Sequence, residues 1–195
     1  MRQAKMNRKT QETEIAIALT LDGTGTSRIA TGIGFLDHML VLLAKHANLD
    51  LEVSAKGDLQ VDGHHTTEDI GIVLGQVIAR ALGDKRGIRR YGNAVIPMDE
   101  ALVQSTIDLS GRPFLVFKAQ FTGDLVGDFE TQLTEEFFRA LAFNAGMTLH
   151  LNCLYGQNDH HKIEGLFKAF ARSFAEAVAI DPSRPEVIPS TKGIL

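Results

Sequence analysis

The segments HHTTE (residues 64–68) and HHKIE (residues 160–164) decide the fold of this chain, because one histidine-histidine-x-x-glutamate motif occurs in each half. A similar stretch precedes each copy, LAKHANLDLEV (43–53) in the first half and LAFNAGMTLHL (141–151) in the second. In both stretches a helical spacing of apolar residues passes into the alternation of a strand. Such self-similarity indicates an internal duplication. We therefore expect an α+β fold made of two β-α-β-α half-domains.

Hydrophobic spacing predicts the elements of each half. In the first half it predicts a strand at 13–21, a glycine-rich turn at 22–34, a helix at 35–47, a strand at 49–53, a loop at 57–63 and a helix at 65–82. In the second half it predicts strands at 94–98, 102–109 and 114–121, a helix at 132–145, a strand at 147–155 and a helix at 160–179. We expect one domain over residues 1–195, with repeat 1 at about 10–92, repeat 2 at about 93–180, and a proline-rich, non-helical tail at 181–195.

The composition restricts the classes of function. The chain has 195 residues and a formal net charge of −4, so its overall field does not attract nucleic acid or an anionic membrane. No apolar run approaches the roughly 20 residues of a membrane span, and the N-terminus lacks the apolar core of a secretory signal. The single cysteine, Cys153, excludes an internal disulfide framework. We expect a cytoplasmic protein with a small-molecule partner, and the unevenly placed histidines direct attention to a metal site.

The two motifs have the geometry of a pair of metal sites. Residues i and i+4 share one face of a helix, so the first histidine and the glutamate of each motif can bind one cation. The second histidine is rotated by roughly 100° and reaches a different ion. We therefore expect the two halves to exchange ligands, and the repeat alignment adds His38 to one set and Glu136 to the other. One set is His38, His65, His160 and Glu164, and the other is His64, Glu68, Glu136 and His161.

Mixed imidazole and carboxylate ligands suit Mn²⁺ or another six-coordinate cation, with positions left for water or substrate. Structural zinc is the alternative, but it favours several thiolate ligands, and this chain has a single cysteine. Four assignments stay open. Glu135 competes with Glu136 as a ligand, and Asp62 either caps a helix or orients a ligand histidine. His46 either contacts substrate or caps a helix, and His150 is interpreted as a structural polar residue.

At this point the sequence resembles a known family over essentially its whole length. The segments that carry the resemblance to imidazoleglycerol-phosphate dehydratase are GFLDHML (34–40), DGHHTTEDIG (62–71), EEFFRALAFNAG (135–146) and GQNDHHKIEGLFKAFAR (156–172), together with ETEIAIALTLDGTG (12–25), DLSGRP (108–113) and STKG (190–193). Two positions depart from the usual family pattern: many members have histidine where this chain has Glu136, and proline is common at the position of Gly34.

The resemblance implies dehydration of imidazole glycerol phosphate to imidazole acetol phosphate in histidine biosynthesis, at a di-manganese centre with the two ligand sets given above. It implies two similar halves, each packing helices on a four-stranded sheet, as in the ribosomal protein S5 domain 2-like fold. It also implies assembly of trimers into a 24-subunit shell, with active sites at the subunit interfaces.

The resemblance also implies roles for individual side chains. The candidate catalytic residues are Glu12, His65, Glu68 and Glu164, and a metal-bound water is a further candidate acid or base. Glu12 and three histidines are candidate substrate contacts: the ligand-set histidines His38 and His64, and His46. Recognition of the phosphate group needs cationic and hydroxyl donors, and the matching positions are Arg90, Arg112, Lys168, Ser190 and Lys192.

Two other classes of function compete with the dehydratase. A dinuclear metallohydrolase acting on a phosphate ester needs the same ligands and cations, but it releases inorganic phosphate. A non-catalytic metal-storage shell needs the ligands and has no use for the phosphate-binding cations. The identity of the acid or base, the metal in the cell and the oligomer size are not fixed by the sequence.

Overall fold

The computed structural model describes residues 2–195. The first half of the chain forms, in order, β1 (Gln3–Lys9), β2 (Thr13–Thr20), β3 (Ser27–Ala30), α1 (Gly34–Ala47), β4 (Asp50–Gly57) and α2 (His64–Leu82). The second half forms β5 (Tyr91–Met98), β6 (Ala101–Asp108), β7 (Phe114–Lys118), α3 (Leu133–Ala145), β10 (Thr148–Tyr155) and α4 (Asp159–Val178). A short hairpin of β8 (Leu125–Val126) and β9 (Phe129–Glu130) precedes α3.

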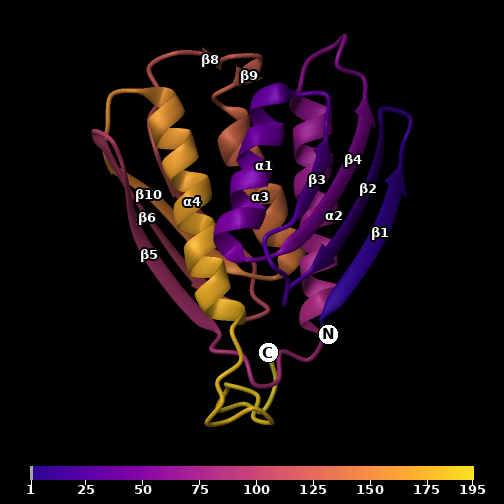
Figure 1. Cartoon of the computed structure of the whole chain (residues 1–195), viewed down its shortest axis with the longest axis vertical. Helices are drawn as coiled ribbons and strands as arrows, with labels where there is room; N and C mark the ends of the chain where they lie inside the picture. The colour runs from indigo at the N-terminus through magenta and orange to yellow at the C-terminus, as the bar shows by residue number, and fades with distance from the viewer. Residues whose placement is uncertain (1) are drawn as a thin grey trace.

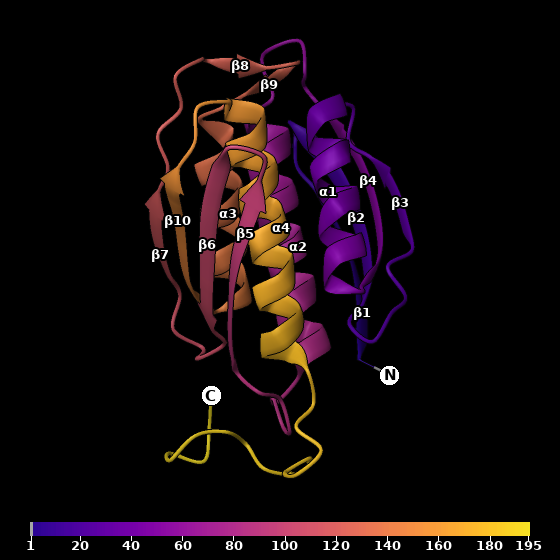
Figure 2. The same cartoon turned by 60° about the vertical axis from the view of Figure 1, so that its left-hand side comes forward.

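Each half contributes one four-stranded sheet, and the two sheets have the same topology. The strand order is β1-β2-β4-β3 in the first and β5-β6-β10-β7 in the second. In each sheet three strands are antiparallel, and the third strand of the half pairs in parallel with the last. Figures 1 and 2 show the helices packed between the two sheets. The predicted duplicated α+β fold with four-stranded sheets is confirmed.

The strands form where apolar residues alternate, because one face of each sheet is covered by helices. Along β2 and the residue after it, Ile15, Ile17, Leu19 and Leu21 are all buried, and the intervening positions are more exposed. The helices bury one stripe each, at the 3.6-residue period of their apolar residues. The four helices within residues 2–195 thus share one core with the inner faces of both sheets, and none of them is long and apolar enough to cross a membrane.

Helices from different halves pack in pairs, α1 with α4 and α2 with α3. A Cβ atom on Gly71 of α2 would lie 2.7 Å from the carbonyl oxygen of Phe137 in α3, and one on Gly75 would lie 2.6 Å from that of Leu141. The two helix backbones therefore approach closely along this seam. Residue numbers increase in the same direction along this contact in both helices, from Gly71 to Gly75 in α2 and from Phe137 to Leu141 in α3. The two helices are therefore parallel, and their first turns lie at the same end.

Several strands differ from the sequence prediction. The strand β4 runs to Gly57, beyond the predicted end at 53, and β5 begins at Tyr91, before the predicted start at 94. The strand β1 (Gln3–Lys9) was not predicted, because polar and charged residues occupy most of its positions and only Ala4 and Met6 supply an apolar alternation. The region 22–34 was predicted as a turn, but Ser27–Ala30 forms β3 alongside β4. The strand predicted at 114–121 ends at Lys118, and the β8–β9 hairpin was not foreseen. The predicted helices start and end within about one residue of their observed bounds.

Candidate metal centre

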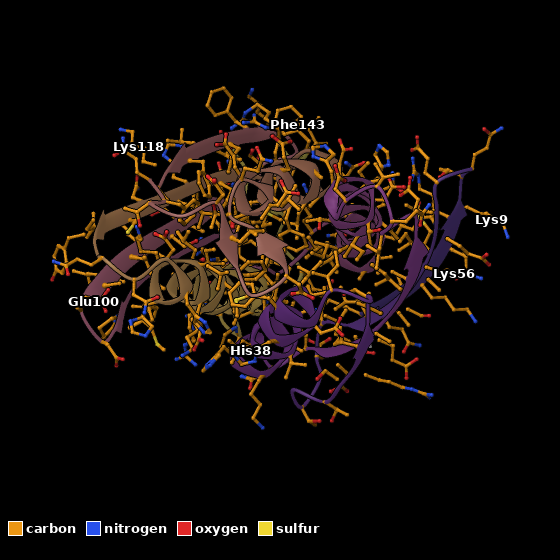
Figure 3. All side chains as sticks on the ribbon, turned by 90° about the horizontal axis from the view of Figure 1, so that it is seen from above. Lys9, His38, Lys56, Glu100, Lys118 and Phe143 are labelled. Atoms are coloured by element: carbon orange, nitrogen blue, oxygen red, sulfur yellow. The ribbon has the colours of Figure 1, made fainter. Side chains whose placement is uncertain are left out.

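Two imidazoles and one carboxylate converge where α1 packs against α4. His38 comes from α1, and His160 and Glu164 come from the first turns of α4. One ligand atom from each of the three lies within 4.8 Å of the others. Glu164 Oε2 is 3.1 Å from His160 Nε2 and 3.5 Å from His38 Nε2. Figure 3 shows His38 near the edge of the molecule, and its side chain is about half exposed, so the group is open to an incoming ion or substrate.

Local structure holds these side chains in place. The Asn158 side chain caps α4 by accepting hydrogen bonds from the backbone N–H groups of His160 and His161. The ring of Phe35, at the start of α1, packs edge-on against the His160 ring with 5.0 Å between centroids. His160 and Glu164 are four residues apart on the helix, and this spacing places both side chains on the face that meets α1.

Glu164 is buried and carries a negative charge at neutral pH. Burial by itself would raise the pKa of its carboxyl group, but hydrogen bonding to the Lys168 ammonium, with a smaller effect from His160, lowers the pKa below its usual value. Lys168 Nζ lies 2.6 Å from Glu164 Oε1. The other oxygen, Oε2, faces the two histidines, so it remains available to a cation.

The donor set fits a divalent cation. Two neutral imidazole nitrogens and a carboxylate oxygen are ligands that Mn²⁺, Zn²⁺ and related ions accept. The His38 and His160 side chains are 49% and 43% exposed, and this exposure leaves room for water, substrate or further ligands around the same point. Within residues 2–195 this is the one place where three such ligand atoms converge.

The remaining candidate ligands lie elsewhere in the chain. His64 and Glu68 are in the first turns of α2, and the parallel packing of α2 on α3 brings Glu136 to the same end. Asp62 accepts a hydrogen bond from the backbone N–H of His64, 2.8 Å away. The N-cap of α2 is Gly63 and has no side-chain cap bond, so Asp62 lies one residue before the cap, and its role in orienting a ligand histidine stays a prediction. Arg139 pairs with Glu135 and also lies 4.0 Å from Glu136, so the choice between these two glutamates as a metal ligand stays open.

His65 and His161, the second histidines of the motifs, do not join the group formed by His38. His65 Nε2 lies 3.9 Å from the Glu12 carboxylate, which is in the turn before β2. His161 lies beside Glu100, in the turn between β5 and β6, with Nδ1 and Oε2 2.7 Å apart. Figure 3 shows Lys9, at the end of β1, and Glu100 on opposite sides of the molecule. The sequence reasoning missed Glu100, because a single acidic residue in a turn has no diagnostic spacing.

The candidate phosphate-binding residues gather at the other end of α4. The backbone N–H of Arg90 donates to the carbonyl of Ala177, and about 20 Å of helix separates Ala177 from Glu164. The guanidinium of Arg90 donates to Asp108 and to the carbonyl of Pro189, the residue before Ser190. This end therefore includes Arg90, Arg112, Ser190 and Lys192, whereas Lys168 lies instead beside Glu164.

Comparison with known proteins identifies the family. The family of imidazoleglycerol-phosphate dehydratase matches residues 31–174. The chain belongs to this family. A relative from Azorhizobium caulinodans is 60% identical over 195 residues, covering 100% of this chain and 99% of its own length. A relative from Acetivibrio thermocellus is 57% identical, again covering 100% and 99% of the two chains. Both are named imidazoleglycerol-phosphate dehydratase.

Solved structures of imidazoleglycerol-phosphate dehydratase have the same fold. The crystal structure from Staphylococcus aureus has a TM-score of 0.83 at 44% identity and covers 91% of this chain and 98% of its own. The structure from Pyrococcus furiosus also has a TM-score of 0.83, at 34% identity, and covers 97% and 100%. The predicted family, fold class and enzyme class are confirmed: the chain is a dehydratase.

Two histidines of this dehydratase lie outside the ligand sets. His46, two turns after His38 on α1, is half-buried, and burial together with the nearby charges of Lys168 and Arg172 lowers its pKa. It therefore faces the same α1–α4 seam as the candidate metal group. His150 lies exposed on β10. The role of His46, in substrate contact or in helix capping, stays open, and a structural role for His150 stays a prediction.

Proposed function

We propose that this chain converts imidazole glycerol phosphate to imidazole acetol phosphate, a dehydration in histidine biosynthesis, at a centre of two manganese ions in the cytoplasm. The observation that carries the proposal is the convergence of His38, His160 and Glu164 between α1 and α4. Relatives of more than half identical sequence over the full chain bear the name of this activity. A small phosphorylated substrate also gives a purpose to the cations that gather near Arg90.

The ligand sets are proposed to be completed between subunits. His38, His160 and Glu164 would hold one ion together with His65 of a neighbouring subunit, because His65 stands apart from them within one chain. His64, Glu68 and Glu136 would hold the other ion together with a neighbour's His161. The separation of the phosphate-binding end from Glu164 supports the same conclusion, because one small substrate cannot span about 20 Å. We propose trimers assembled into a 24-subunit shell.

The reaction expels hydroxide from the carbon attached to the imidazole ring and removes a proton from the neighbouring carbon, which keeps its own hydroxyl group. The resulting enol becomes the ketone by moving one proton. Bound divalent cations supply Lewis acidity and stabilise developing negative charge. The protein must supply a base for the carbon-bound proton and an acid that protonates the departing hydroxide.

Four side chains are proposed for this proton transfer: Glu12, His65, Glu68 and Glu164. The Glu12 carboxylate is 56% exposed and reaches toward His65 Nε2, so it can approach a bound substrate and accept a proton from it. Glu164 is held ionised by Lys168, which favours a ligand role over that of an acid. His38, His46 and His64 are proposed to contact substrate beside the ions.

The phosphate group is proposed to bind at the end of α4 formed by the tail and the Arg90 segment. The Asp108 carboxylate pairs with Arg90 and lies 3.8 Å from Arg112, so it orients the Arg90 guanidinium and brings the exposed Arg112 close to it. Ser190 and Lys192 add a hydroxyl and an ammonium from the exposed tail. Lys168 is proposed as a further contact from the other side, because its ammonium lies at the metal group.

The test is an assay of the purified, Mn²⁺-loaded protein with imidazole glycerol phosphate. We expect a keto product, no inorganic phosphate, and loss of activity on treatment with EDTA. Release of phosphate would support a metallohydrolase instead, and metal uptake without turnover would support storage. His64→Ala should lose most activity and about one ion per site, whereas His150→Ala, the matched control, should keep both. Full metal content in His64→Ala would contradict the ligand sets.

A further inference from the structure

The second histidine of each motif has a carboxylate at the same ring nitrogen. His65 Nδ1 lies 3.0 Å from Asp58 Oδ2, and His161 Nδ1 lies 2.7 Å from Glu100 Oε2. An ionised carboxylate only accepts hydrogen bonds, so the ring nitrogen that faces it carries the proton. The carboxylates nearest to Nε2 are farther away, Glu12 Oε1 at 3.9 Å in His65 and Asp99 Oδ2 at 3.6 Å in His161, which is beyond hydrogen-bonding distance. In both histidines this arrangement leaves the lone pair on Nε2, the nitrogen on the far side of the ring.

The two carboxylates reach their histidines from different places in the repeat. Asp58 lies in the loop between β4 and α2, which spans residues 58–63, whereas the loop between β10 and α4 spans only 156–158. The second half therefore has no counterpart of Asp58. Glu100 takes the position instead, from the turn that joins β5 to β6. The carboxylate contact at Nδ1 is thus made once in each half, but by segments that do not correspond in the repeat. Inheritance of one ancestral contact through the duplication does not explain this.

The local contacts of Asp58 and Glu100 direct one carboxylate oxygen of each residue toward its histidine. Asp58 Oδ1 is buried without a partner in the described part of the chain, and the Asp58 side chain makes its hydrogen bond to His65 through the other oxygen. Glu100 Oε1 accepts the backbone N–H groups of Gln157 and Asn158, at 3.0 and 2.8 Å. These bonds tie the β5–β6 turn to the start of α4, so the remaining oxygen has a fixed direction toward His161.

We propose that Asp58 and Glu100 are positioning residues: each accepts the Nδ1–H of its histidine and thereby presents Nε2 as the metal-binding atom. Carboxylates that hold the second nitrogen of a ligand histidine fix its tautomer and ring orientation and raise its basicity. His38 and His160 have no such partner at Nδ1 within residues 2–195, since their contacts run through Nε2. The inference rests on the proposed metal centre, in which His65 completes one ligand set and His161 completes the other, each from a neighbouring subunit.

The test is a titration of the metal-stripped, full-length protein with Mn²⁺ alone, in which free Mn²⁺ is counted by electron paramagnetic resonance. Asp58→Asn and Glu100→Gln keep the shape of each side chain and remove its charge. Each should weaken Mn²⁺ binding by about 10- to 100-fold at half of the sites. Glu14→Gln is the control, because Glu14 is an exposed carboxylate of β2 that pairs with Lys9 and lies in neither ligand set. Asp58→Glu should recover part of the lost affinity.

A second measurement separates positioning from a purely structural role. The ¹⁵N chemical shifts of the imidazoles in the metal-free protein report the tautomer directly once the rings are neutral. Because hydrogen bonds to Asp58 and Glu100 raise the pKa of His65 and His161, the spectra are recorded at about pH 9, well above the usual pKa of histidine. We expect an unprotonated Nε2 in His65 and His161 of the wild type, and a mixture of tautomers at His65 in Asp58→Asn. This readout stands even if a variant assembles poorly, because the wild-type spectrum alone tests the tautomer.

The outcomes separate this inference from the function on which it rests. If the wild type binds no Mn²⁺, the proposed metal centre fails and the inference with it. If the wild type binds Mn²⁺ and both variants bind it equally well, the positioning role is overturned and the metal centre stands. An unprotonated Nδ1 in the wild-type histidines would also overturn it.

Discussion

His38 Nε2 lies 3.5 Å from Glu164 Oε2, although the two residues belong to different halves of the duplicated chain. The same exchange occurs at the second helix pair, where α2 of the first half packs against α3 of the second. Each candidate ligand group is therefore built from one helix of each half. Neither half contains a complete ligand group, so both copies of the duplicated unit are required to form each candidate metal site.

Removal of the Lys168 charge should make the stability of the protein depend on metal. In Lys168→Met, buried Glu164 loses the ammonium 2.6 Å away. In the metal-free protein the loss should cost about 1–3 kcal/mol of unfolding free energy. A divalent cation at Glu164 replaces the missing positive charge, so added Mn²⁺ should stabilise the variant more than the wild type. Thermal denaturation with and without Mn²⁺ measures both effects. Lys118→Met, at an exposed position of β7, is the control, and an equal Mn²⁺ effect in variant and wild type would contradict the prediction.

Much of the fold follows from local patterns. The period-two alternation of β2 and the helical spacing of α1 were visible in the sequence, because burial on one face selects apolar residues at a fixed period. The repeated motif also predicted that His38 belongs with His160 and Glu164. The ion pair of Glu164 with Lys168 had a sequence signal as well, since the two residues are spaced i and i+4 on a helix.

Other features had no such signal. The strand β1 is assembled by pairing with β2, and its own side chains carry little periodicity. Asp58 and Glu100 lie in a loop and a turn, where no period links a residue to its partner. Their contacts with the histidines depend on how the chain returns on itself in three dimensions, and local patterns do not encode this.

The close packing of α2 on α3 predicts an unusual response to Gly71→Ala. Inside an exposed helix this change stabilises by up to about 1 kcal/mol. Here the new Cβ would lie 2.7 Å from the Phe137 carbonyl oxygen, so the helices must separate, and we expect a loss of roughly 1–3 kcal/mol. Urea denaturation measures the change. Gly123→Ala, whose Cβ would meet only ordinary contacts, is the control, and a stabilised Gly71→Ala would show that the seam is loose.

Asp50 should make stability depend on pH in the acid range. Its carboxylate accepts the backbone N–H groups of Thr24 and Thr26, and these bonds lower its pKa. A group with a lowered folded-state pKa stabilises the fold above its unfolded pKa of about 3.9, and this contribution is lost as the pH falls through the folded value. Asp50→Asn should therefore be less stable than the wild type at neutral pH, with a difference that shrinks in acid. Denaturation curves across this range test it, with Glu52→Gln as control; a difference independent of pH would contradict the assignment.

Sharing of the site between subunits predicts complementation between two inactive variants. His160→Ala damages the group on α1 and α4, and His65→Ala damages the residue that a neighbour contributes. When the two variants are co-expressed in equal amounts, about one site in four should combine an intact His160 with an intact His65, restoring about a quarter of wild-type activity. Co-expression of His38→Ala with His160→Ala should restore none, because both belong to the same half of the site. Equal recovery in the two mixtures, or none in the first, would show that the ligands are not exchanged between neighbours.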